Sequence, residues 1–271
     1  DVFTDSAPRV ATVVDAIVDI GQGTAPYLVV RFADDSVRSS DALFPMPLYL
    51  FREREDGPGL NLLVTDETYL SNMPTLDQVT VRSPDVADSE WDRWFYAYWN
   101  AAPVLTTQDL MQRERQYRSY QYQYGSGPQV VPSAVMRATE LIETRVRSPE
   151  GRSIGEIADA VINLESGQLL LFNLVPAAGQ GAGESNYLIP LAAFIGNRET
   201  TTITYDVEEY GLTGPSGFSG AWPDITGDSY HRRLALFWNA RDVDTRYGLG
   251  MTIVPVRLLS AERLSGYGLF T

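Results

Sequence analysis

The chain has 271 residues, 44% of them hydrophobic and 21% charged, a balance that predicts a globular protein with room for two ordinary domains. Its formal net charge of −14 argues against a nucleic-acid partner, because phosphate binding relies on basic side chains, and it disfavours docking on anionic lipid. There is no Cys, and every basic residue is Arg rather than Lys, so thiolate nucleophiles, Cys-ligated metals, Schiff-base catalysis and a Walker lysine are excluded.

Membrane crossing is not expected, since no apolar run approaches the roughly 20 residues that a spanning helix needs. A chain without Cys and Lys would be chemically unreactive outside the cytoplasm, which favours an extracellular or cell-envelope location. A composition bias of the genome would explain the same two absences, and it leaves a cytoplasmic location open.

The first segment of the chain recurs in its second half. Residues 1–19 align without gaps with residues 145–163, and their hydrophobic and acidic positions coincide. Both copies then reach a Gly-containing turn, at 21–23 and 165–167, followed by a run rich in β-branched and aromatic residues. The units between the turn signals are short and mostly alternate apolar with polar residues, which predicts strands of a small sheet or barrel in each copy.

Three later blocks match in the same order: 44–51 with 187–194, 62–74 with 203–215, and 84–101 with 223–240. The first pair shares a Pro-Leu-x-x-Phe core at Pro47 and Pro190. In the last pair, apolar side chains recur at i, i+4, i+7 and i+8, which predicts one stripe of a short helix. These stripes consist of Trp91, Phe95, Tyr98 and Trp99 in the first copy and Tyr230, Leu234, Phe237 and Trp238 in the second.

The predicted fold is therefore mainly β, with two small barrels in tandem, each followed by a short aromatic helix that buries its stripe. The first copy with its helix occupies residues 1–101, and a linker rich in Tyr, Gln and Arg occupies 102–128. The second copy with its helix occupies 129–240. Residues 241–271 contain a further linker and the opening strand of a third repeat, or a donor strand for another barrel.

The second copy resembles a known family. Its residues ATELI at 138–142 and RVRSPEGRSIGEIADAVINLESG at 145–167 are similar to the PRC-barrel, which occurs in the photosynthetic reaction-centre H subunit and in the C-terminal part of a ribosome-maturation factor. The segment YLSNMPTLD at 69–77 resembles the tails of stand-alone bacterial members. The first copy matches more loosely, since Ala11 stands where the second has Gly155. This resemblance implies a compact barrel used for protein contacts, without catalytic residues or a cofactor.

The two ends of the chain differ in a way that suggests assembly. Residues 253–271 align without gaps on 130–148, the lead-in and first strand of the second barrel, whereas the first copy has no lead-in. The chain would then be an excerpt of a longer array, or its last strand would complete the first barrel of the same chain or of a neighbour. The partners expected are other copies of itself or flanking repeats. The predicted interface residues at the two ends are Asp1, Val2, Phe3, Thr4, Leu264, Tyr267, Leu269 and Phe270.

The linker offers a second candidate contact surface. Tyr120, Tyr122 and Tyr124 alternate with glutamines, so an extended backbone would place the three rings on one face. Together with Tyr117 they could form an interface, since Tyr is favoured there. Alternatively, these tyrosines pack on the neighbouring barrels.

Other polar residues suggest no chemistry. His231 is the only histidine, so there is no second His for a metal site. Asp15 and Asp19 could bind Ca²⁺, but the second copy has Asn163 at the Asp19 position and no EF-hand spacing occurs, which favours plain loop acids. The Gly-rich segment 179–185 lacks a Lys and a helix signal, so a hairpin loop is favoured over a phosphate cradle. We expect no metal and no cofactor.

Two functions from different classes remain. The first is a non-catalytic structural or assembly protein that uses tandem barrels for protein–protein contacts and polymerises end to end by strand complementation. The alternative is an extracytoplasmic module that binds a small ligand or carbohydrate through exposed tryptophans, and the positions of Trp91 and Trp94 would distinguish it. An enzyme would need a convergent carboxylate pair, which the sequence does not place.

Overall fold

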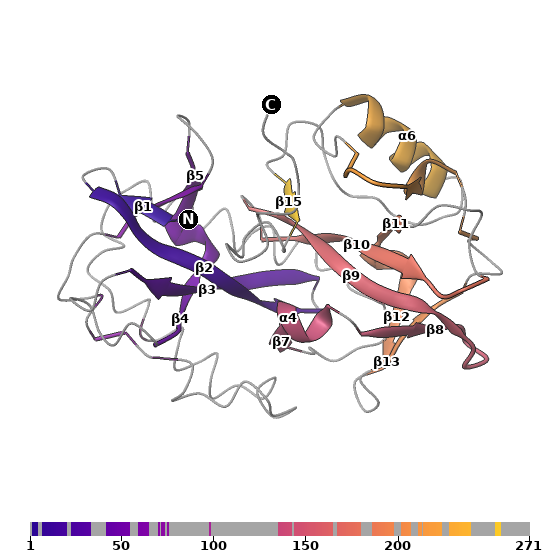
Figure 1. Ribbon diagram of the computed structural model, residues 1–271, viewed down its shortest axis with the longest axis horizontal. Coiled ribbons are helices and arrows are strands. Elements are labelled where there is room, and N and C mark those ends of the chain that lie inside the picture. Colours follow the sequence, from indigo (N-terminus) through magenta and orange to yellow (C-terminus); the bar gives the residue numbers. More distant parts are fainter. Residues whose placement is uncertain are drawn as a thin grey trace.

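Two β-sheets lie side by side in the computed structural model of the chain (Figure 1). The predicted mainly β fold is confirmed, because most of the assigned elements are strands. The structure describes residues 2–4, 7–20, 23–33, 42–54, 59–64, 70, 72–73, 75, 98, 135–142, 144–164, 167–179, 186–197, 202–206, 211–212, 214–223, 228–239 and 253–255.

The first sheet curls round on itself. Within the described residues its strands follow the order β4-β3-β2-β1-β6-β5. The strand β7 also pairs with β2 and so forms a branch of this sheet. The strands at its two ends, β4 and β5, are consecutive in the chain and are joined by the 3-10 turn η1 (Leu48–Leu50). The strands are β1 (Val2–Thr4), β2 (Ala7–Asp19), β3 (Thr24–Phe32), β4 (Phe44–Pro47), β5 (Phe51–Glu53), β6 (Leu60–Leu62) and β7 (Val135–Arg137).

The second sheet follows the order β12-β13-β8-β9-β10-β11-β14 within the described residues, and β15 pairs with β9. Its strands are β8 (Arg145–Arg147), β9 (Ser153–Asn163), β10 (Leu169–Pro176), β11 (Asn186–Pro190), β12 (Phe194–Asn197), β13 (Thr202–Tyr205), β14 (Gly217–Phe218) and β15 (Ile253–Pro255). The remaining elements are the 3-10 turns η5 (Leu191–Ala193) and η6 (Gly214–Ser216) and the helices α4 (Ala138–Leu141) and α6 (Asp228–Asn239).

The two sheets share one pairing pattern. The strand β1 runs antiparallel to β2 and parallel to β6, as β8 does to β9 and β13. Asp15 lies opposite Val29, and Asp159 lies opposite Asn173. The register shifts directly before each of these acidic residues, so β2 and β9 carry a bulge at the same place. Because an extra residue reverses which face the following side chains occupy, bulges at the same place keep corresponding residues on corresponding faces.

The turn signals of the sequence have clear structural counterparts. Gly23 and Gly167 end the predicted hairpin turns with φ of 68° and 67°, in the left-handed region that Gly adopts without strain. Pro47 and Pro190 end β4 and β11 with nearly equal angles, φ −52° and ψ 136° in one and φ −57° and ψ 141° in the other. Proline fixes φ and lacks an N–H, which suits the last residue of a strand before each 3-10 corner.

One predicted alignment is wrong in register. The sequence match of 62–74 with 203–215 puts Leu62 over Ile203. Strand pairing instead equates Leu60 with Ile203, because these residues lie opposite Val2 and Val146 respectively. The shift is two residues, and side chains alternate between faces with a period of two, so the hydrophobic pattern fits both registers.

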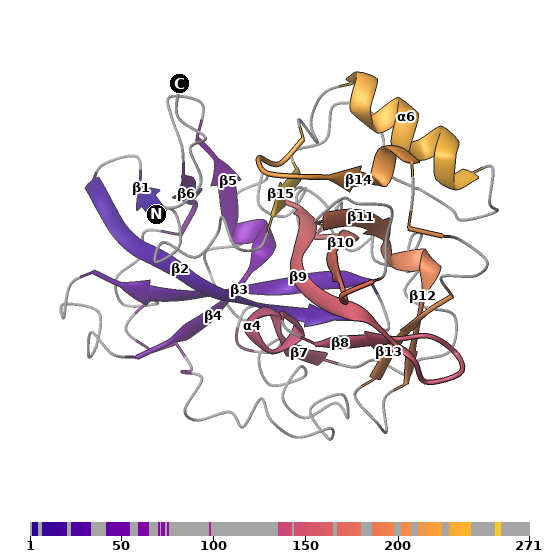
Figure 2. The same ribbon diagram turned by 45° about the vertical axis from the view of Figure 1, so that its right-hand side comes forward.

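A second alignment is wrong by five residues. The ungapped match of 253–271 with 130–148 puts Ile253 over Val130, but Ile253 pairs with Asn163 as Val135 pairs with Asp19. The strands β7 and β15 therefore occupy corresponding places, each beside the C-terminal part of the long strand of the sheet that precedes it in the chain (Figure 2). The lead-in thus extends the preceding sheet instead of opening the next one, and α4 also packs against β2.

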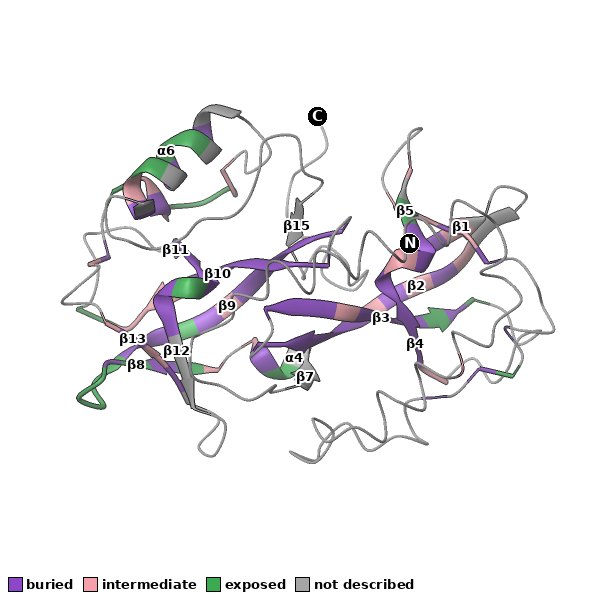
Figure 3. Ribbon diagram, turned by 180° about the vertical axis from the view of Figure 1, so that it is seen from behind, coloured by how far each residue is buried: buried purple, intermediate pink, exposed green. Residues whose placement is uncertain are grey.

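The buried side chains of both sheets form one continuous hydrophobic core. In β9 exposed and buried residues are mixed at first, and burial becomes continuous over the last five residues, where both faces of the strand are covered. Figure 3 shows the long strands buried over most of their lengths, whereas α6 has exposed residues on its outer side. The ends of the long strands next to the turns at Gly23 and Gly167 thus lie inside the molecule, and the two sheets meet at these ends.

The helix α6 turns Tyr230, Leu234 and Trp238 inward, and these three side chains are buried. Phe237 is half-buried and packs against Gly214 in η6. Of the predicted first-copy helix, only Tyr98 is described, and it packs half-buried against the core. No helix within the described ranges is long and apolar enough to cross a membrane.

Candidate functional site

The predicted interface strand at the N-terminus has a partner on each side. Val2 and Phe3 lie opposite Leu60 and Asn61 of β6, and Val2 also lies opposite Ala11 of β2. Val2 is fully buried, and the guanidinium carbon of Arg54 lies 4.0 Å from the centre of the Phe3 ring. The strand β1, which ends at Thr4, is therefore internal to the sheet. A strand added beside it would have to displace β2 or β6.

The other predicted interface residues cannot be placed. They lie outside the described residues and are Asp1, Tyr117, Tyr120, Tyr122, Tyr124, Leu264, Tyr267, Leu269 and Phe270. The first-copy tryptophans Trp91 and Trp94 also lie outside the described residues. Among the tryptophans that the structure does describe, Trp238 is buried and Trp222 is half-buried, with its ring 5.5 Å from that of Phe218.

The acidic residues predicted to lie in loops are instead inside strands. Asp15 and Asp19 belong to β2 and are buried, so the prediction of plain loop acids was wrong. The carboxylate of Asp15 accepts a hydrogen bond of 2.9 Å from the backbone N–H of Ala16, and Asp159 accepts one of 2.8 Å from that of Ala160. A buried carboxylate needs such donors, and these also hold the bulged backbone in place.

Metal and phosphate chemistry find little support in this part of the chain. The described residues contain no group of three or more His, Cys, Asp and Glu side chains that could hold a metal ion. His231 lies in α6. Of the Gly-rich segment 179–185, only Gly179 is described, and its φ of 84° is typical of a turn.

The site that the structure brings together is the contact between the two hairpin tips. Thr24 of the first sheet forms an isolated antiparallel bridge with Gln168 of the second. The N–H of Ala25 donates to the carbonyl of Gly167 over 2.6 Å, and the N–H of Leu169 donates to the carbonyl of Gly23 over 2.9 Å. These two hydrogen bonds flank the bridge, so it is the pair type in which opposite side chains come closest.

Each partner in this contact is the counterpart of the other. Thr24 directly follows the turn glycine Gly23, and Gln168 directly follows Gly167. The two hydrogen bonds are likewise reciprocal, since each runs from the residue after the bridge to the turn glycine of the other sheet. The two tips thus meet as they would around a two-fold axis, the geometry of an isologous interface.

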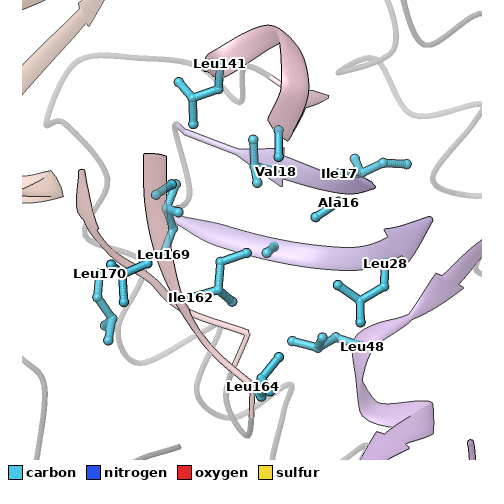
Figure 4. Close-up of a cluster of buried hydrophobic side chains, with 14 of the residues drawn as sticks. Ala16, Ile17, Val18, Leu28, Leu48, Leu141, Ile162, Leu164, Leu169 and Leu170 are labelled. Atoms are coloured by element: carbon cyan, nitrogen blue, oxygen red, sulfur yellow. The ribbon is translucent and has the colours of Figure 1, made fainter. Parts of the chain in front are cut away.

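Apolar side chains from both halves of the molecule pack together in the common core. Figure 4 shows Ile162, Leu164 and Leu169 from the second half beside Leu28 and Leu48 from the first, and all five are buried. At about 25 cal/mol per Å² of apolar surface, such packing supplies most of the attraction, whereas the backbone hydrogen bonds fix orientation and register.

Polar groups at this contact are also buried. Thr24 is 5% exposed and Gln168 6%, and Asp19 and Asn163 at the ends of β2 and β9 are buried as well. The N–H of Asn163 donates to the carbonyl of Gln168, and the N–H of Gly167 donates to that of Asn163, both over 2.8 Å. Water is therefore largely excluded from the contact. Its composition suits recognition between folded surfaces.

Sequence reasoning missed this contact. Both turns were found, because glycine marks them, but Thr24 and Gln168 are ordinary residues with no pattern of their own. The one usable signal was the repeat itself, since two similar surfaces in one chain can pair with each other.

No family model matches this chain, and no curated protein matches it.

Proposed function

We propose that this chain is a non-catalytic scaffold, built from two PRC-type barrels in tandem, that acts through contacts with other protein chains, including copies of itself. The observation that carries the proposal is the reciprocal contact of the hairpin tips, in which the backbone of one sheet hydrogen-bonds to that of the other. Recognition of this kind needs no reacting group, because backbone hydrogen bonds and buried apolar side chains supply the affinity.

A role without catalysis agrees with the inventory of reactive groups. The sequence has no Cys, no Lys and a single His, and the buried carboxylates of Asp15 and Asp159 bond to backbone N–H groups at their bulges. The same lack of Cys and Lys supports a location outside the cytoplasm, in the cell envelope or the extracellular space.

Assembly by strand insertion beside β1 is not the mode we propose. Both sides of β1 are occupied within the chain, by β2 and β6. Breaking either pairing would expose buried apolar side chains such as Val2, as well as backbone donors and acceptors. We place the contacts between chains at the linker tyrosines, because Tyr combines a large apolar ring with a hydroxyl and is favoured at interfaces.

The test measures the mass of the full-length chain in solution over a range of concentrations. We expect the wild type to form oligomers and the triple variant Tyr120→Ser, Tyr122→Ser and Tyr124→Ser to lose them. The control is Leu236→Ser, which removes an exposed apolar side chain from α6 and should leave the oligomers intact. A wild-type chain that stays monomeric at every concentration, or a triple variant with unchanged oligomers, would contradict the proposal.

A further inference from the structure

The contact between the hairpin tips holds together two sheets of the same kind. Each sheet contributes the same three groups: a turn glycine whose carbonyl accepts a hydrogen bond, a polar residue at the bridge, and a backbone N–H one residue later that donates a hydrogen bond. Each of these groups meets its counterpart on the other sheet. A surface that fits its own counterpart in this way is the self-complementary surface found in two-fold symmetric dimers.

Nothing in such a contact requires the two sheets to belong to one chain. The first sheet, with β7 and α4 packed on it, is joined to β8 of the second sheet by the short segment after Leu141, and the bridge itself is held by backbone hydrogen bonds. Short connections of this kind favour exchange of domains between chains. The first sheet of one chain would therefore make the same contacts with the second sheet of another chain. Within one chain the contact is favoured at low concentration, because the partner is always near, whereas exchange between chains becomes competitive as concentration rises.

We propose that this face is a homotypic docking surface whose partner is a second copy of the chain, which gives dimers with exchanged sheets. The first sheet of each chain docks on the second sheet of the other, and both copies of the Thr24–Gln168 bridge re-form. This inference rests on the proposed function as a protein-contact scaffold and deepens it by naming the partner and the face.

Charge at the bridge provides the test, because like charges directly opposite each other destabilise a strand pair whereas opposite charges stabilise it. The acidic chain carries Thr24→Glu and Gln168→Glu, and the basic chain carries Thr24→Arg and Gln168→Arg. In either chain alone, both the internal contact and any exchanged contact set like charges together. In an exchanged dimer of one acidic and one basic chain, both bridges pair Glu with Arg.

Every chain in this test, the control included, also carries Tyr120→Ser, Tyr122→Ser and Tyr124→Ser, which removes the oligomers expected from the linker. The expected result is a 1:1 complex, with about twice the mass of one chain, that forms when the acidic and basic chains are refolded together and that neither forms alone. The control chain, Thr24→Glu with Gln168→Arg, pairs opposite charges internally and should remain monomeric at the same concentration, with the urea midpoint of the wild type. A mixture without the 1:1 complex overturns the inference.

A second measurement keeps the test decisive if the charged chains do not fold. Since the wild type has no Cys, chains with Thr24→Cys alone and Gln168→Cys alone can be refolded together at high concentration and oxidised. Exchange predicts a disulfide between residue 24 of one chain and residue 168 of the other. Its yield should be at least ten times that for the Thr24→Cys chain mixed with an exposed Arg152→Cys chain. Equal yields overturn the inference.

The two proposals fail in different ways. If mixed charged chains form no complex but wild-type oligomers still depend on the linker tyrosines, the docking inference falls and the scaffold function stands. If the mixed complex forms but the triple tyrosine variant keeps the wild-type oligomers, the scaffold function through the linker falls and the docking surface remains.

Discussion

Replacing Gly155 with Ala should destabilise the protein although Ala is the better residue for a strand. A Cβ at this position would lie 2.2 Å from the carbonyl oxygen of Val175 and 2.9 Å from the Cα of Pro176. Both obstacles are backbone atoms, so no side chain can rotate out of the way, and β9 and β10 must separate. Gly155 is also buried between β8 and β10, opposite Val146 on one side and Pro176 on the other.

The magnitude follows from two opposing terms. Overpacking of a dense interior costs about 1–3 kcal/mol, and a clash with backbone belongs at the upper end of that range. Against this, Ala restricts the unfolded chain and returns about 0.4–1 kcal/mol. We therefore expect Gly155→Ala to lower the free energy of unfolding by about 2 kcal/mol.

Equilibrium urea unfolding measures this difference, provided that the m-value is unchanged. The matched control is Gly151→Ala, since Gly151 has a φ of 84° and no atom lies within 4 Å of the added Cβ. It carries only the conformational cost of the left-handed region, about 1 kcal/mol. A Gly155→Ala variant as stable as the wild type, or less affected than the control, would refute the close approach of β9 and β10.

Three further predictions concern aromatic residues. The hydroxyl of Tyr230 is buried and has no hydrogen-bond partner among the described residues, so Tyr230→Phe should keep or raise the free energy of unfolding. In contrast, Tyr205→Phe removes a hydrogen bond of 2.7 Å to the Gly211 carbonyl, so it should lower the free energy of unfolding in urea by about 1 kcal/mol. Burial raises the pKa of Tyr230, so the unfolded chain releases that proton first and stability falls as pH rises above about 10; a Tyr230→Phe variant with the same loss between pH 9 and 11 would contradict this. Arg54→Met should lose about 0.5–1 kcal/mol through the contact with the Phe3 ring, and in a double-mutant cycle this share of the cost should be absent from a Phe3→Leu background.

Local signals in the sequence predicted local structure well. Gly23 and Gly167 mark turns because glycine alone adopts their backbone angles without strain. Pro47 and Pro190 mark corners because proline ends strand pairing. Each of these signals acts through the conformation of a single residue, so it does not depend on the rest of the fold.

Register and strand partners could not be obtained in the same way. The alternation of apolar and polar residues is unchanged by a shift of two, which is why Leu62 was aligned where Leu60 belongs. The strands β7 and β15 were assigned to the predicted barrel that follows them, but hydrogen bonds join them to the sheet that precedes them in the chain. Position along the chain does not say which of two similar sheets a short strand extends.

The candidate site depends on contacts between distant parts of the chain, and these were not predicted. Asp15 and Asp159 were matched as acidic positions, but only the structure shows that both are buried at bulges within strands. The pairing of Thr24 with Gln168 depends on how the sheets pack, which no local pattern encodes.

The meeting of the two hairpin tips can be tested most directly by a disulfide in the doubly substituted chain, Thr24→Cys with Gln168→Cys. No other cysteine competes, and opposite residues of a close antiparallel pair have the Cα separation that a disulfide requires. In dilute solution we predict nearly complete oxidation within monomers and a gain in unfolding free energy of up to about 5 kcal/mol from the long closed loop. A chain whose two thiols stay free in dilute monomers, while a small alkylating reagent modifies both, would contradict the contact on which the proposed function rests.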